Sequence, residues 1–133
     1  MDILITTNHL INFGGSEKFV LHLIRAFIEQ DESVFINVIH AGESFEHAIE
    51  HGALKWSGQP VDVILINHNS TKEVLNVGKR ETKVFQICHG IYPFLEQPIS
   101  NLDGYFAVSP EVREFLFRGG FDSHLLWNPT LFR

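Results

Sequence analysis

Short runs of apolar residues alternate along the whole chain with longer stretches in which apolar and polar residues are mixed. The apolar runs are rich in Ile, Val and Phe and are bounded by turn residues, a pattern typical of buried strands. They predict five strands and a last short one, which are Asp2–Thr7, Ser33–His40, Val61–Ile66, Lys83–Cys88, Gly104–Val108 and Ser123–Trp127.

The mixed stretches predict helices between these strands. Ser16–Gln30 carries apolar residues three and four positions apart, so one wide face of this helix is apolar. Pro110–Arg118 has a proline at its first position, follows the favoured N-cap residue Ser109, and ends before two glycines. Shorter helices are expected over Glu43–Gly52 and Lys72–Gly78.

Strands that are apolar on both faces and separated by helices are typical of a parallel sheet that is covered on both sides. The sequence therefore predicts an α/β fold, a doubly wound, mainly parallel Rossmann-like sheet with helices on both faces. The 133 residues fit a single domain, 1–133. Because such sheets bind ligands beyond the carboxyl ends of their strands, the residues that follow each strand are the first candidates for a site.

Composition narrows the classes of partner. Apolar residues make up 44% and charged residues 20%, as in an ordinary globular domain, and the formal net charge is −6. An acidic chain is a poor match for nucleic acid or for an anionic membrane, both of which attract clustered Lys and Arg.

A single cysteine, Cys88, excludes an intrachain disulfide and a cysteine-rich zinc site. No transmembrane segment is predicted, because no run approaches about 20 apolar residues; the N-terminus lacks the signal-peptide pattern, so a cytoplasmic location is expected.

Four histidines fall at predicted strand ends, namely His9, His40, His68 and His89. Imidazoles gathered at one edge of a sheet could supply hydrogen bonds, acid–base chemistry or metal ligands. Their spacing matches no compact metal motif, so no metal site is predicted. His89 follows a buried strand and precedes a glycine, which makes it the first candidate for contact with a substrate. The alternative is a loop histidine whose side chain is satisfied within the protein.

The connection between the first strand and the first helix ends in Gly14 and Gly15, followed by Ser16. Glycines allow a ligand to approach the backbone closely, and unpaired N–H groups at a helix start attract phosphate. The dinucleotide fingerprint G-x-G-x-x-G is absent, which argues against NAD. The alternative is that the two glycines only make a tight start to the helix.

His47 and His51 lie four residues apart in the second predicted helix, a spacing also found in zinc-binding helices. Glu43, Glu46 and Glu50 lie around them in the sequence, so we interpret this helix face as solvated. A zinc site is therefore not predicted there.

Three segments, in their order along the chain, resemble motifs of the family 4 glycosyltransferases. The opening strand and the run Gly14-Gly15-Ser16-Glu17 resemble the family's GG-A/S-E start. VFQICHG, residues 84–90, resembles the family's strand that ends in His-Gly. The third segment is residues 103–132, DGYFAVSPEVREFLFRGGFDSHLLWNPTLF. It is similar to the family's stretch that contains the AVS element, then a helix and a glycine, and at its end an Asn and a Phe. Together the three cover essentially the whole chain.

The resemblance implies a GT-B glycosyltransferase, built from two Rossmann-like domains that face a cleft. This chain would be the N-terminal, acceptor-side domain, and a C-terminal donor domain, to which nothing here corresponds, would hold most of the nucleotide-sugar site. That domain would act in cis or in trans, and the isolated acceptor-side domain is expected to be inactive. The implied substrates are a nucleotide sugar and a glycan or lipid acceptor, without a metal or other cofactor. A lipid acceptor would add peripheral contact with a membrane.

The same resemblance implies roles for individual residues. His89 corresponds to the strand-end histidine that faces the transferred sugar, and it is the candidate catalytic residue. Gly14, Gly15 and Ser16 correspond to the loop near the donor diphosphate. Ser109 and Glu111 correspond to the start of the helix after the family's AVS element. Together with His9, Asn12 and His68, which are chosen for their positions after predicted strands and not from the resemblance, they are the candidate acceptor or sugar contacts.

Two other functions stay open from the sequence. The chain could be a stand-alone, non-catalytic binding or interaction module with a Rossmann-like fold. In that case the apolar run Leu125-Leu126-Trp127 would favour docking onto a partner. It could also be an unrelated nucleotide-binding enzyme with a Rossmann-like fold.

Overall fold

The computed structural model describes residues 1–76, 81–90, 94 and 97–126. Its strands are β1 (Asp2–Leu10), β2 (Ser33–Ala41), β3 (Leu54–Lys55), β4 (Val63–Ile66), β5 (Lys83–Cys88), β6 (Gly104–Ala107) and β7 (His124–Leu125). Its helices are α1 (Gly15–Glu29), α2 (Glu43–Glu50), the 3₁₀ helix η1 (Asn69–Asn76) and α3 (Pro110–Arg118). In the described part of the chain, no helix is both long and apolar enough to cross a membrane.

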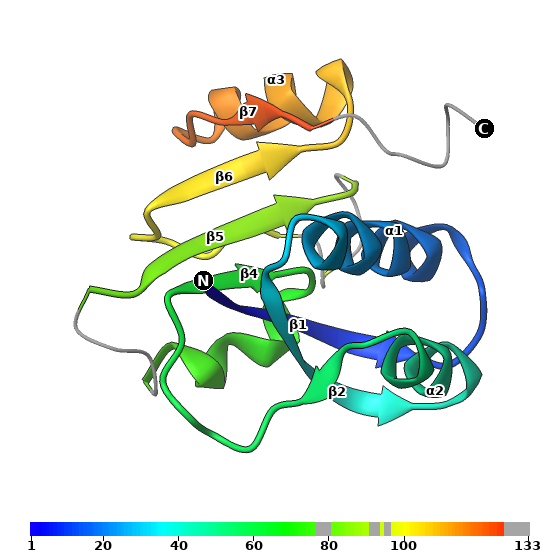
Figure 1. Cartoon of the computed structure of the whole chain (residues 1–133). Coiled ribbons are helices and arrows are strands. Elements are labelled where there is room, and N and C mark those ends of the chain that lie inside the picture. The colour runs from blue at the N-terminus through cyan, green and yellow to red at the C-terminus, as the bar shows by residue number, and fades with distance from the viewer. Residues whose placement is uncertain (77–80, 91–93, 95–96, 127–133) are drawn as a thin grey trace.

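The strands form one sheet in the order β3-β2-β1-β4-β5-β6-β7, and every neighbouring pair is parallel. The chain builds outward from β1 to β2 and β3, then returns past β1 to β4 and builds outward in the other direction (Figure 1). This arrangement confirms the predicted doubly wound, Rossmann-like sheet. The change of direction lies between β1 and β4, where such sheets leave a crevice for ligands.

Alternate strand residues divide the core between the two faces of the sheet. On one face, Ile3 and Ile5 of β1 belong to the same cluster as Phe19 and Ile24 of α1 and Ala48 of α2. The apolar side of α1 that the sequence pattern predicts is therefore the side that covers the sheet.

The other face is covered by η1 and α3. Leu4 of β1 packs in one cluster with Val84 of β5 and Leu75 of η1. Cys88 lies on the same face of β5 as Val84, because strand residues an even number apart point the same way, and it packs in a cluster with Val112 of α3. The predicted helices on both faces are thus confirmed, and Cys88 is a buried core residue.

The first strand is longer than predicted. β1 continues past Thr7 through Asn8 and His9 to Leu10, because β2 is equally long and pairs with it as far as Leu10 opposite Ala41. His9 therefore lies inside a strand and not after one. The polar residues Asn8 and His9 interrupt the apolar pattern, so the pattern does not predict this part of the strand. Pairing with β2 extends β1 through them.

Other elements differ at their ends. The predicted helix over Lys72–Gly78 is the 3₁₀ helix η1, with non-helical angles at Thr71, whose hydroxyl donates to the carbonyl of His68 at 2.8 Å. β4 starts at Val63, and the two-residue strand β3 is too short for any pattern to predict. The last predicted strand is reduced to β7. Trp127 and residues 77–78, at the end of the predicted helix, lie outside the described residues.

Candidate functional site

The carboxyl ends of β1, β4 and β5 meet at the change of strand order. β4 pairs with β1 on one side and with β5 on the other, so the residues that end these strands are neighbours. Asn67 and His68 follow β4 directly, and His89 follows β5. We call the polar side chains at this edge the strand-end cluster, which consists of Thr7, His9, Asn67, His68 and His89.

Asn67 lies at the centre of the cluster and is only 1% exposed. Its side-chain nitrogen donates to the hydroxyl of Thr7 at 3.0 Å, and that hydroxyl lies 2.8 Å from Nδ1 of His68. The backbone N–H of Asn8 also donates to this Nδ1, at 3.1 Å. Because Nδ1 of His68 accepts, it carries no proton, and the Thr7 hydroxyl donates to it. Neutral His68 therefore holds its proton on Nε2.

His89 is held from two sides. Its Nε2 lies 2.6 Å from Oδ1 of Asn67. An amide oxygen can only accept, so Nε2 carries the proton and Nδ1 carries the lone pair of the neutral ring. Phe19 of α1 packs edge-on against the imidazole, with ring centroids 4.7 Å apart. β4 and α1 together therefore set the orientation of this ring.

The rings of His68, which is buried, and of His89, which is partly buried, are both neutral at pH 7. Burial lowers the pKa of His89 to about 4. Burial is also the largest cause that lowers the pKa of His68 to about 4; His9 and His89 lower it further, and Glu17 acts in the opposite direction. Near neutral pH these imidazoles are hydrogen-bonding groups and not acids.

His9 stacks on His68, with ring centroids 5.0 Å apart, and its Nδ1 lies 3.1 Å from the side-chain oxygen of Asn8. His40 is the register partner of His9 in β2, but it is exposed. The structure thus gathers His9, His68 and His89 and leaves His40 on the surface. Within the described ranges, no three His, Cys, Asp or Glu side chains are grouped to hold a metal ion.

Glu17, in the first turn of α1, organises the loop after β1. Its side chain is 6% exposed and accepts the backbone N–H groups of Ile11 and Asn12 at 2.7 Å and of Gly14 at 3.2 Å. Burial raises the pKa of this carboxyl, but the three backbone hydrogen bonds outweigh burial and lower the pKa below its ordinary value. Sequence reasoning assigned Glu17 no role of its own. Its place three residues after the N-cap, as in a capping box, is the signal that could have found it.

The glycines at the start of α1 have different environments. Gly14 is the N-cap, and a Cβ there would lie 3.0 Å from Oε1 of Glu17, whereas a Cβ on Gly15 would meet nothing within 4 Å. The close approach of the carboxylate therefore favours glycine only at position 14. The N–H groups of Gly15 and Ser16 belong to the first turn, which has no partners for them within the helix, so an anion at this helix start would bind them.

The last two candidate contacts lie at the start of α3. The Ser109 hydroxyl accepts the backbone N–H of Val112 at 3.2 Å, which confirms the predicted N-cap. Glu111 is exposed in the first turn of the same helix. The hydroxyl of Ser109 therefore caps the helix as an acceptor, and its role as a sugar or acceptor contact stays a prediction.

No protein-family model matches this chain, and comparisons with curated proteins and with solved structures found no match. The resemblance to family 4 glycosyltransferases therefore stays a prediction. A fold by itself does not imply an activity, so any function has to be argued from the site. What the structure establishes is a Rossmann-like α/β domain with a polar cluster at its change of strand order.

Proposed function

We propose that this chain is the acceptor-side domain of a glycosyltransferase that uses a nucleotide sugar, and that the strand-end cluster faces the cleft of that enzyme. The observation that carries the proposal is the position of His89. It lies beside α1 at the carboxyl edge of the sheet, near the change of strand order where Rossmann-like sheets bind ligands. The glycine loop that resembles the family's start follows β1, which is separated from β5 by β4 alone.

The protonation of His89 supports a role beside the sugar. Glycosyl transfer breaks the bond between the anomeric carbon and the diphosphate, so positive charge develops on the sugar ring. A charged imidazole next to that ring would oppose the reaction, whereas burial keeps His89 uncharged. His89 therefore suits positioning of the sugar better than proton transfer.

The start of α1 supports a contact with the departing diphosphate. The N–H groups of Gly15 and Ser16 and the positive end of the helix attract anions. The carboxylate of Glu17 offsets part of this attraction, because it lies in the first turn of the helix and accepts the N–H groups of the preceding loop. Most of the binding energy for the diphosphate would therefore come from a partner domain, and this chain would provide a weak half-site.

Titration of the ¹⁵N-labelled protein with a panel of uridine-, guanosine-, adenosine- and thymidine-diphosphate sugars tests the proposal. With the correct donor, saturable shifts of backbone amides should concentrate at Gly14–Glu17 and at His89. His89→Ala should weaken binding about tenfold, which corresponds to about 1.4 kcal/mol. The matched change His124→Ala, at an exposed histidine of β7, should leave binding unchanged.

Two outcomes would contradict the proposal. Binding that His89→Ala leaves intact would remove His89 from the site. A protein that binds no member of the panel would favour the alternative function, a non-catalytic binding module.

A further inference from the structure

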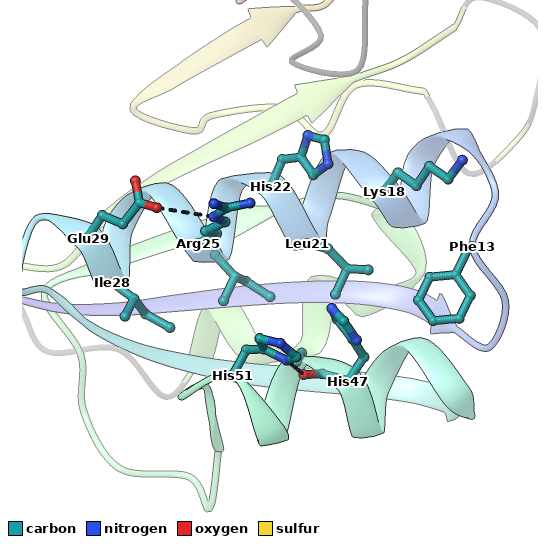
Figure 2. Close-up of a pocket in the computed structure, with 11 residues that line it drawn as sticks. Phe13, Lys18, Leu21, His22, Arg25, Ile28, Glu29, His47 and His51 are labelled. Carbon is teal, nitrogen blue, oxygen red and sulfur yellow. Dashed lines mark hydrogen bonds and ion pairs between the residues drawn. The ribbon is translucent and has the colours of Figure 1, made fainter. Parts of the chain in front are cut away.

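A groove of about 660 Å³ runs between α1 and α2 (Figure 2). Leu21, Ile24 and Ile28 supply apolar surface from α1, Ala48 contributes from α2, and Phe13 of the loop after β1 stands at one end. The volume lies within the roughly 300–1,000 Å³ that is typical of small-molecule pockets. Phe13 is 42% exposed, so part of this apolar surface faces solvent. We call this feature the α1–α2 groove.

The α2 wall of the groove is formed by aromatic rings. His47 and His51 stack with centroids 4.1 Å apart, and Phe13 meets His47 edge-on at 5.8 Å. Nδ1 of His51 lies 2.7 Å from the carbonyl oxygen of His47 and donates to it, which holds that ring in place. These two histidines point towards α1 (Figure 2), so the solvated face expected from the sequence is one side of a groove.

Side chains with N–H donors make up most of the polar part of the lining, and two of them, Lys18 and Arg25, are cationic in a chain whose formal net charge is −6 with histidines neutral. Among the described residues, the acidic exception is Glu29, whose Oε1 is already 3.1 Å from Nε of Arg25. An anionic group in the groove would therefore meet little repulsion and several potential partners. The basic lining residues are Lys18, His22, Arg25, His47 and His51.

We propose that the α1–α2 groove binds a single-chain amphipathic anion, a fatty-acid carboxylate, with its apolar chain between the two helices and its carboxylate beside Lys18. The stretch of α1 from Lys18 to Glu29 is about 16 Å long, which gives room for an extended chain. The volume of about 660 Å³ is that of a small-molecule pocket, which favours one such chain over a folded partner.

Lys18 is the natural partner of the carboxylate. It is exposed at the end of the groove where Phe13 stands, whereas Arg25 shares its charge with Glu29 (Figure 2). Its long side chain can lie along the apolar wall while the ammonium group stays at the mouth. The inference does not depend on the proposed glycosyl transfer, because the groove and the strand-end cluster are lined by different residues.

Calorimetric titration of the whole protein with sodium dodecanoate, kept below its critical micelle concentration, tests the inference. We expect saturable binding of one molecule, with amide NMR shifts confined to α1, α2 and Phe13. Dodecan-1-ol has the chain without the charge, and acetate has the charge without the chain. Dodecan-1-ol should bind up to about fivefold more weakly, because the ion pair that it lacks is exposed, and acetate should bind more weakly still, because it lacks the apolar chain.

Variants distinguish binding in the groove from binding elsewhere on the surface. Lys18→Glu should weaken dodecanoate binding about fivefold or more, whereas Lys55→Glu, the same change at an exposed position of β3, should not alter it. Leu21→Asp, which puts a carboxylate in the apolar wall, should abolish binding, with its fold checked by the amide spectrum.

Four results would each overturn the inference. They are an absence of saturable binding, equal affinity for dodecan-1-ol, shifts that lie outside the groove, and equal effects of the two lysine variants.

Discussion

Asn67 connects His68 and His89 of the strand-end cluster. Its side-chain nitrogen is committed to Thr7, and this turns its oxygen towards His89. A side chain that is 1% exposed needs partners for both of its polar atoms, and these two bonds supply them. Asn67 is therefore a positioning residue, which selects the Nε2–H form of His89.

The first prediction is that Asn67→Asp raises the pKa of His89. A carboxylate oxygen in place of the amide oxygen, 2.6 Å from Nε2, would favour the charged imidazolium. Two-bond ¹H–¹⁵N spectra should show the Nε2–H form of His89 in the unmodified protein at pH 7 and a raised pKa in the variant. Asn101→Asp, at an exposed asparagine, should change neither. An Nδ1–H form of His89 in the unmodified protein would contradict the arrangement.

At the scale of elements, the connections that follow β1 and β2 pack against each other. The N–H of Gly42 donates to the carbonyl of Leu10 at 2.8 Å, and a Cβ on Gly42 would lie 2.8 Å from the Cα of Ile11. The Cα of Ile11 is a backbone atom, so it can move away from a Cβ on Gly42 only if the loop that Glu17 organises moves with it. A Cβ on Gly15, the first residue of α1, would meet nothing within 4 Å.

Gly42→Ala should therefore lower the free energy of unfolding by about 1–3 kcal/mol, the usual range for forced overpacking. Gly15→Ala should leave the free energy of unfolding unchanged or raise it by up to about 1 kcal/mol, because alanine is the better helix former. Urea denaturation followed by circular dichroism measures both variants. Equal losses in the two would show that the contact between the connections is not what restricts position 42.

For two elements, the bounds predicted from the sequence agree with the bounds in the structure to the residue. α3 covers Pro110–Arg118 as predicted, since the Ser109 cap, the proline and the following glycine all mark its limits. β5 also has its predicted bounds, Lys83–Cys88. η1 departs from its prediction because the Thr71 hydroxyl bonds the backbone of His68 and competes with regular helix geometry.

At the scale of the whole molecule, the buried histidines make stability depend on pH. His68 and His89 have a pKa of about 4 in the folded protein, against 6.5 in an unperturbed chain. Between these values the unfolded state binds more protons than the folded state, so the free energy of unfolding falls as the pH drops from about 6.5 to about 4. The pKa of Glu17 is lowered, so its contribution is present above its ordinary value of 4.5 and is lost as the pH falls through its folded value.

Urea denaturation at a series of pH values from 7.5 to 4 tests this dependence. We expect a loss of roughly 2–3 kcal/mol per buried histidine over the window. His68→Gln and His89→Gln together should flatten the dependence relative to a matched pair of changes at exposed positions, His40→Gln and His124→Gln. A slope that survives loss of both buried rings would assign the pH dependence to other groups.

The sequence by itself determined the class of fold and most of its elements. Apolar periodicity reports which side of each element is buried, and caps and glycines report where elements end; both are local properties of the chain. They were enough to predict a parallel, doubly wound sheet and to direct attention to the ends of its strands.

Only the tertiary structure determined which side chains come together in the site. The bond between Thr7 and His68 joins residues 61 positions apart, and no local pattern records such a pair. The order of the strands brings β1, β4 and β5 together, which gathers His68 and His89 and leaves His40 outside. The α1–α2 groove likewise exists because two separate helices cover one face of the sheet. Side chains meet through packing, and packing depends on strand order and register as well as on sequence.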